Sequence, residues 1–194
     1  QHLARFPSKK DLSLALHEVF DCAKKSALKI QGTDDNSDAA VQIARYFKIP
    51  EDIIKDTLSK SKIPDRRGNS SLINGFEIID NSYNVSEITA LHSITTARSI
   101  ATAKKKKLIV ITAGIPELGR ENADAHTHLG AHLDASADVV ILLRSIFFSE
   151  IAVQISQKKV KSAQSMQEAH KLLSEYDPSE YIVLMLPELT DVYY

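Results

Sequence analysis

The chain has 194 residues, a formal net charge of −1 at pH 7 and a sequence isoelectric point near 6.7, so its overall charge favours neither nucleic acid nor an acidic membrane surface as a partner. Hydrophobic residues make up 43% of the sequence and charged residues 25%, the composition of an ordinary soluble globular protein with a substantial core. No segment reaches the ~18 apolar residues that a membrane helix needs, and the single cysteine, Cys22, excludes an internal disulfide and fits a reducing compartment.

The N-terminal third of the chain is expected to be helical. Apolar side chains recur with helical spacing over residues 11–31. A second helix is predicted from 37 to 47, and Pro50, a residue suited to the first helical position, opens a third helix through Leu58. The segment Gln1–Arg5 has neither an initiating methionine nor a signal-peptide pattern, so we expect the chain to be a piece of a longer one.

A polar, turn-rich stretch follows at residues 64–71, and we place a domain boundary there. Beyond it strands and helices alternate, and the continuous Val, Ile and Leu runs indicate strands that are buried on both faces. This pattern predicts a Rossmann-like α/β fold with a mainly parallel sheet. The predicted domains are residues 1–68, a helical segment, and residues 69–194, the α/β domain. The predicted strands are 76–80, 107–113, 138–143 and 181–186, and the predicted helices are 86–103, 122–133, 149–156 and 165–174.

Two of these strands end in polar, turn-forming residues. The strand over 76–80 runs into Asp80-Asn81-Ser82-Tyr83-Asn84, and the strand over 107–113 is followed by Pro116-Glu117-Leu118-Gly119. Ligands of α/β sheets bind beyond the carboxyl ends of the strands, so the two stretches predict the rim of a site. For Asp80 and Asn81 the alternative is an Asx turn, in which the side chain bonds its own backbone instead of a ribose or a phosphate-bound water.

Other chemistry-bearing residues allow two interpretations each. Arg66 and Arg67 either clamp a phosphate or carboxylate through the guanidinium fork or are surface arginines without a function. His128 and His132 have the spacing of metal-binding histidines on a helix, but no glutamate completes that arrangement, and no metal site is expected. Cys22, among apolar neighbours, is most simply a packed side chain. The chain contains no Gly-x-x-x-x-Gly-Lys-[Ser/Thr] sequence, so it has no phosphate-cradling loop of its own.

Four motifs occur in the order and on the predicted elements of one enzyme family. Residues 36–40, Asn-Ser-Asp-Ala-Ala, match a helix that begins with an asparagine and a pair of alanines, and Asp65-Arg66 is similar to a Gly-Arg step at a domain entry. Residues 80–87 are similar to Asp-Asp-Ser-Tyr-Asn-Ala-Asn-Pro, and Glu117-Leu118-Gly119 is followed at the family's spacing by His126 and then a glycine. By these motifs the chain resembles the C-terminal part of the Mur ligases, most of all the members that add D-alanyl-D-alanine to a UDP-linked muramoyl tripeptide.

The resemblance implies an ATP-dependent ligase that forms an amide bond through an acyl phosphate in cell-wall precursor synthesis. Such chemistry needs cations at the transferring phosphoryl group and a site closed to water. ATP and Mg²⁺ would be held mainly by a central ATPase domain, of which residues 1–68 would be the end. The C-terminal domain would act as a lid and bind the incoming amino acid or dipeptide beside the UDP-linked muramoyl peptide. We therefore expect a cytoplasmic enzyme whose C-terminal part contacts the rest of its own polypeptide and binds no ATP tightly by itself.

The resemblance also implies roles for individual residues. Arg66 would face phosphate and, with Asp80, serve catalysis, and Asn36 would lie near the adenine. The residues on the nucleotide side would be Asn36, Arg66, Asn81, Tyr83 and Asn84, and those of the substrate-side loop would be Glu117, Gly119 and His126.

The chain departs from the family's motifs at several points. Asn81 replaces an aspartate that would take the ribose hydroxyls, Val85-Ser86-Glu87 replaces Ala-Asn-Pro, and residues 113–116 replace an aspartate-methionine step. After the strand over 181–186, residues 187–191 stand in place of a Lys-Gly-Ser-Arg-like loop. These departures leave two alternatives open: a catalytically silent binding or assembly module, and a ligase of another polymer or of a folate-type substrate.

Overall fold

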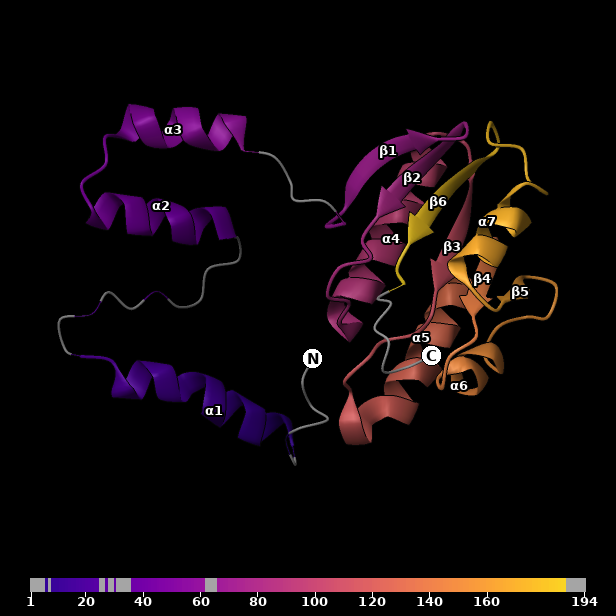
Figure 1. The fold of residues 1–194 in the computed structure, drawn as a ribbon, viewed down its shortest axis with the longest axis horizontal. Coiled ribbons are helices and arrows are strands. Elements are labelled where there is room, and N and C mark those ends of the chain that lie inside the picture. The colour runs from indigo at the N-terminus through magenta and orange to yellow at the C-terminus, as the bar shows by residue number, and fades with distance from the viewer. Residues whose placement is uncertain are drawn as a thin grey trace. The chain divides into compact units, whose positions relative to one another are not determined.

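The computed structural model describes residues 8–24, 36–61 and 66–187, together with Phe6, Ala27 and Ile30. Contacts between Cα atoms divide the chain into two compact units, one spanning Ser8–Ile63 and the other containing Pro64–Tyr194. The first unit is helical, and the second holds a β-sheet covered by helices (Figure 1). The predicted fold class, a helical segment followed by an α/β fold, is confirmed.

Three α-helices lie within the described residues of the helical unit, as predicted: α1 (Lys9–Cys22), α2 (Asn36–Tyr46) and α3 (Glu51–Lys60). The hydroxyl of Ser8 caps α1 by accepting a hydrogen bond from the backbone N–H of its third residue at 3.2 Å. α1 ends well before the predicted limit at residue 31. Pro50 lies at the N-cap of α3, one position earlier than predicted.

This unit buries little apolar surface by itself. Among the side chains described in it, only Ile54 is buried, whereas Tyr46 and Phe47 are 54% and 70% exposed. Cys22, which we predicted to be packed, is exposed. A helical unit of this size without a core needs further apolar surface to cover it.

The second unit is built on a six-stranded sheet with the order β1-β2-β6-β3-β4-β5. β1 is antiparallel to β2 and all other neighbours are parallel, so the sheet is mainly parallel, as predicted. The strands are β1 (Asn69–Ile73), β2 (Phe76–Asp80), β3 (Lys107–Thr112), β4 (Val139–Leu143), β5 (Val160–Ala163) and β6 (Tyr181–Met185).

The two strands that the sequence did not predict, β1 and β5, are the edges of this sheet. β1 is exposed at every position after Asn69, and in β5 only Ala163 is buried. A strand with a neighbour on one side only lacks the continuous apolar run of a central strand. The prediction of a linker through residue 71 was therefore wrong for residues 69–71, which begin β1.

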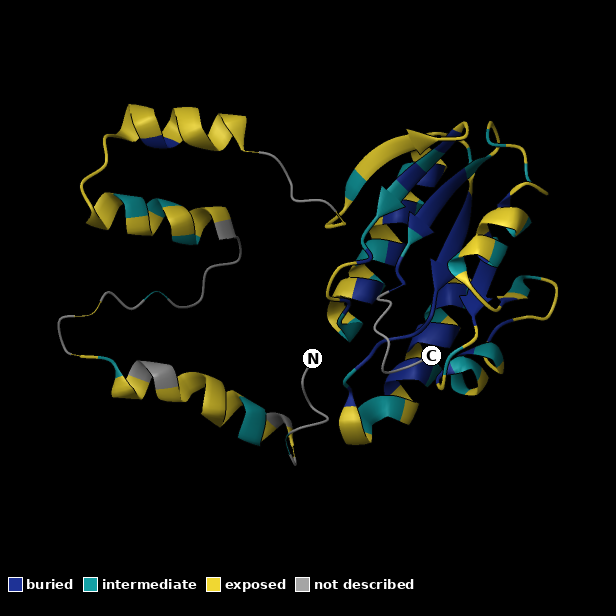
Figure 2. Cartoon of the chain, in the orientation of Figure 1, coloured by how far each residue is buried: buried dark blue, intermediate teal, exposed yellow. Residues whose placement is uncertain are grey.

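Helices cover both faces of the sheet (Figure 1). One face packs against α4 (Glu87–Ala103), α5 (Asn122–Ser136) and α6 (Phe148–Ala152), and the other against α7 (Met166–Leu173). Figure 2 shows the central strands buried between these layers. Side chains that alternate along β3, β4 and β6 enter two separate hydrophobic clusters, one on each face, as the period of a strand requires.

Limited trypsin digestion of the chain should cut near Arg66 or Arg67 and leave a stable fragment that contains the sheet. Both arginines are exposed, and the sheet with its helices has hydrophobic clusters of its own on both faces. Mass spectrometry of the fragments measures where the first cut falls. A first cut within residues 107–143, or rapid loss of the C-terminal fragment, would contradict the predicted domain boundary.

Candidate functional site

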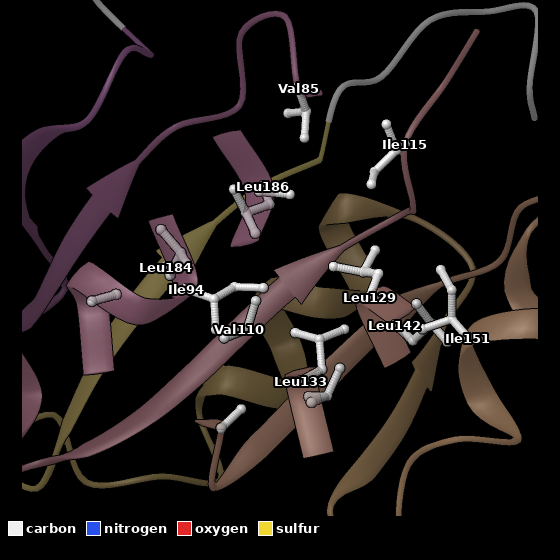
Figure 3. Packing of buried hydrophobic residues seen from close by; sticks show 14 of the residues in the cluster. Val85, Ile94, Val110, Ile115, Leu129, Leu133, Leu142, Ile151, Leu184 and Leu186 are labelled. Atoms are coloured by element: carbon white, nitrogen blue, oxygen red, sulfur yellow. The ribbon is translucent and has the colours of Figure 1, made fainter. Parts of the chain in front are cut away.

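The two polar segments predicted to form a rim follow the C-terminal ends of β2 and β3, on either side of the end of β6. The backbone N–H of Asn81, just beyond β2, donates to the carbonyl oxygen of Met185 at 2.9 Å, and that of Leu186 donates to β3 at 2.9 Å. Val85, Ile115 and Leu186 belong to one hydrophobic cluster (Figure 3). We call residues 80–84 the first rim loop and residues 113–119 the second rim loop.

The first rim loop is held in a turn by the side chain of Asp80. Its Oδ1 accepts hydrogen bonds from the backbone N–H of Ser82 at 3.1 Å and from the hydroxyl of Ser82 at 2.6 Å, which is the Asx-turn geometry. Arg66 donates from Nε to the same hydroxyl at 2.9 Å and from Nη2 to the carbonyl oxygen of Ser82 at 3.1 Å. Ser82, only 3% exposed, therefore links Arg66 to Asp80.

The backbone around Arg66 is tied to the same loop. The carbonyl oxygen of Arg66 accepts from the N–H of Tyr83 at 3.1 Å, and the N–H of Gly68 donates to the carbonyl oxygen of Asp80 at 2.6 Å. Arg66 has φ 63°, an uncommon conformation for a residue with a side chain. These contacts hold Arg66 beside the first rim loop although its side chain is exposed.

The other residues of the first rim loop point to different surroundings. Asn81 donates from Nδ2 to the hydroxyl of Ser93 on α4 and lines a groove of about 290 Å³ beside that helix. Tyr83 is 51% exposed, and the guanidinium of Arg67 lies 4.5 Å from the centre of its ring. Asn84 has φ 57°, a left-handed conformation that asparagine tolerates. Of the residues predicted for the nucleotide side, Tyr83 and Asn84 face solvent and Asn81 binds α4.

The second rim loop is anchored by buried apolar residues and exposes its end. Ile115 and Leu118 are 0% and 4% exposed, Glu117 is partly buried, and Gly119 is exposed. Glu117 and Gly119 both have positive φ, 62° and 59°. This sharply turned backbone brings the chain from β3 to the start of α5.

The buried imidazole of His126 holds the second rim loop through a hydrogen bond to its backbone. It is fully buried, its Nε2 lies 2.9 Å from the backbone N of Ile115, and its Nδ1 lies 2.7 Å from the carbonyl oxygen of Asn122. Since the Ile115 N–H can only donate, Nε2 is the acceptor and Nδ1 carries the proton. The ring stacks on Phe147, with centroids 4.3 Å apart. His126 therefore acts on the rim by holding Ile115, and its imidazole is inaccessible to a ligand in this conformation.

The free energy of unfolding should depend on pH through His126. Burial lowers the pKa of this imidazole below its ordinary value of 6.5, against smaller opposing effects of the Asn122 carbonyl, Glu150 and Glu87. The unfolded chain then binds the proton more readily than the folded chain. The free energy of unfolding therefore has its full value above about pH 6.5 and decreases as the pH falls toward the lowered pKa. Urea unfolding from about pH 7 to about pH 5 should show a steeper loss for wild type than for His126→Gln. Equal slopes would contradict this role.

No group of three or more His, Cys, Asp and Glu residues within the described ranges could hold a metal ion. The histidines that share a helical spacing connect α5 to α4 instead. His128 Nδ1 lies 3.5 Å from Glu87 Oε1, and His132 Nε2 lies 3.1 Å from the hydroxyl of Thr95.

Among the described residues, no helix has both the length and the hydropathy of a membrane-spanning segment.

Asn36 is the first residue of α2, but its side chain lies outside those that the structure describes. Its role near an adenine stays a prediction. Three residues at the rim were not singled out from the sequence: Ser82, Ser93 and Phe147. Ser82 stands inside a quoted motif and could have been found from its position two residues after Asp80, the spacing of an Asx turn. Ser93 and Phe147 come from distant segments, and no local signal marks them.

Solved structures with a similar fold include Mur ligases. The MurF ligase from Thermotoga maritima, solved in complex with ADP, superposes with a TM-score of 0.61 and 22% sequence identity over 77% of this chain. A MurF structure from Acinetobacter baumannii gives a TM-score of 0.59 and 21% identity over 78% of the chain. This chain spans about a third of the length of these proteins: 33% in each case. No protein-family model matches the sequence, and no curated protein sequence is significantly similar to it.

Proposed function

We propose that this chain is the C-terminal part of an ATP-dependent, amide-bond-forming ligase of peptidoglycan precursor synthesis. The observation that carries the proposal is the position of the family motifs in space. Residues 80–84 and 117–119 are far apart in the sequence, yet both follow strands that flank β6 and end at one edge of the sheet. The similarity in fold to MurF ligases supports the same assignment.

Arg66 would provide the positive charge of this part of the site. Acyl-phosphate formation concentrates negative charge on the transferring phosphoryl group, and a guanidinium can offer it two parallel hydrogen bonds. The side chain of Arg66 is exposed while its backbone is bonded to the first rim loop, so the charge is both accessible and positioned. Asp80 would act by holding Ser82, which holds Arg66.

The second rim loop would face the incoming amino acid or dipeptide, with Glu117 and Gly119 nearest to it and His126 positioning the backbone. The phosphates of ATP and the Mg²⁺ ion would be held by a central domain, because the chain has no phosphate-cradling loop. That domain would also cover the exposed apolar side chains of the helical unit, and a UDP-linked muramoyl peptide would lie between the domains. Such a ligase would work in the cytoplasm.

A second candidate is a Mur-ligase-like module that no longer catalyses. It is favoured by Asn81, which brings no charge and already donates to Ser93, and by Arg66 and Asp80, which both bond to Ser82 within the fold. ATP-dependent phosphate release by the complete parent protein, supplied with a UDP-linked muramoyl tripeptide and D-alanyl-D-alanine, distinguishes the two candidates. Release that needs both substrates supports the ligase, and no release contradicts it.

The isolated chain should bind Mg-ATP poorly even if the parent protein is an active ligase. The reason is that neither a phosphate loop nor a cluster of magnesium ligands is provided by the described residues or their sequence motifs. Isothermal titration of the chain with Mg-ATP measures the affinity. A dissociation constant in the low micromolar range, about −8 kcal/mol, would place the nucleotide site on this chain and contradict the proposal that a central domain holds ATP.

A further inference from the structure

The outer edge of β1 is open and carries two exposed apolar side chains but no charge. β1 is the first strand in the sheet order, and among the described residues it pairs only with β2. Leu72 and Ile73 are 76% and 50% exposed, and Asn69–Ile73 contains no charged residue. Edge strands are normally protected by charges, prolines or bulges because their free backbone groups accept another strand. β1 has none of the charged or proline residues that would give this protection.

The hairpin between β1 and β2 defines which backbone groups are free. Ile73 pairs with Phe76 across the two-residue turn Asn74-Gly75, whose φ angles of 49° and 85° are those of a type I′ turn. In such a hairpin the pair that flanks the turn is hydrogen-bonded, and bonded and non-bonded pairs alternate along the strands. The N–H and C=O groups of Ser70 and Leu72 therefore point away from β2, toward the open edge.

A groove lies on each face of the sheet beside this edge. The groove on the α4 side, about 290 Å³, is lined by Ser70 of β1, and the groove on the α7 side, about 260 Å³, by Ile73 of β1. An added strand sends successive side chains to opposite faces. One set of its side chains would reach the α4-side groove and the other set the α7-side groove.

The two grooves differ in chemistry, and this difference defines the partner. On the α4 side the carboxylate of Glu77 is neutralised by Lys104 Nζ, 2.6 and 2.7 Å from its two oxygens, which leaves Arg67 as the cationic group of the groove. An acidic side chain complements that groove. The α7-side groove is lined mostly by apolar and aromatic residues, including Phe76, Ile78, Leu173, Tyr176 and Pro178.

We propose that β1 is a docking site for an extended peptide segment of a partner protein, with acidic side chains toward α4 and apolar side chains toward α7. The segment adds to the sheet as a seventh strand beside β1. Its backbone bonds to Ser70 and Leu72 would provide affinity, and the two grooves would provide selectivity. This inference is independent of the proposed ligase function.

The test uses the full chain and a capped eight-residue peptide of alternating glutamate and valine. NMR titration should shift the amide signals of Ser70 and Leu72 and slow their hydrogen exchange. A peptide of alternating lysine and valine should bind at least about fivefold more weakly, because the charge complementarity is reversed. Arg67→Glu should reduce or invert this preference. Failure of the glutamate peptide to bind at about 1 mM, or binding without a charge preference, would overturn the proposal.

Backbone pairing is tested separately at Leu72. Leu72→Pro removes an N–H that points to the open edge, where proline is tolerated, and should abolish peptide binding. Leu72→Ala keeps the N–H and should bind the peptide with an affinity within about twofold of wild type. If circular dichroism shows that Leu72→Pro is unfolded, Ser70→Pro takes its place. Retained binding by a folded proline variant would overturn the proposal. Slow exchange of the same amides that grows with protein concentration in the absence of peptide would assign the edge to a second copy of this chain instead.

Discussion

Under the proposed ligase function, Arg66→Ala in the complete parent protein should lower turnover about a hundredfold or more, the usual effect of losing one preorganised donor. Arg66 is an exposed residue, and its position is fixed by bonds to Ser82 and by the backbone contact to Tyr83. Both features suit a group that neutralises charge on a transferring phosphoryl group. Steady-state kinetics of ATP-dependent phosphate release measures the effect.

Two control variants separate charge from loop structure. Arg67→Ala should change turnover much less, because Arg67 lies over the ring of Tyr83 and has no bond to Ser82 among the described contacts. Ser82→Ala removes one anchor of Arg66 but keeps its charge, so its effect should lie between the two arginine variants. Equal turnover of Arg66→Ala and wild type would remove Arg66 from the site. An equally large loss in Ser82→Ala would mean that Arg66 serves only to shape the loop.

Gly114→Ala should be the most destabilising single methyl addition at the rim. Gly114 has φ 99°, and a Cβ there would lie 2.8 Å from Nε2 of His126 and 2.9 Å from Cδ2 of Phe147, which are stacked and fully packed. Backbone strain and overpacking together should cost about 3 kcal/mol or more of the free energy of unfolding. Urea denaturation of the isolated chain measures it.

Gly68→Ala is the matched control for that experiment. Gly68 has a similar φ of 89°, but a Cβ there would meet nothing within 4 Å. Its cost should be the backbone strain alone, about 1 to 2 kcal/mol. Equal costs for the two variants would mean that the contact of Gly114 with His126 and Phe147 is not tightly packed.

The parts of the fold that the sequence predicted are those in which one local signal suffices. β3, β4 and β6 are continuous runs of Val, Ile and Leu because helices cover both of their faces. The predicted helices over 86–103 and 165–174 begin where predicted, and the structure shows Ser86 and Ser165 as their N-caps. β1 begins with the polar residues Asn69-Ser70-Ser71 and is exposed at every later position, so its first residues have the composition of a linker. Its pairing with β2 is encoded locally by the Asn74-Gly75 turn, a signal that our prediction did not use.

The candidate site was predicted in location better than in detail. The two rim loops meet at one edge because parallel strands end together, and this follows from the fold class alone. His126 was predicted as a substrate-side residue, whereas the structure buries it completely beneath the second rim loop. That outcome depends on Phe147, whose ring stacks on the imidazole. Phe147 lies in the segment after β4, far from His126 in the sequence, so no local pattern predicts the contact.

The position of β6 has a consequence for how the sheet is made during translation. The strand that joins β2 to β3 is the last of the described strands to be synthesised, so the hairpin of β1 and β2 and the group of β3, β4 and β5 cannot share a sheet until residue 185 has left the ribosome. Until then β2 and β3 each present an unpaired apolar edge, a surface open to wrong pairing and aggregation. A nascent chain stalled before Tyr181 would hold two separate half-sheets, so the final folding step of this unit waits for the synthesis of β6.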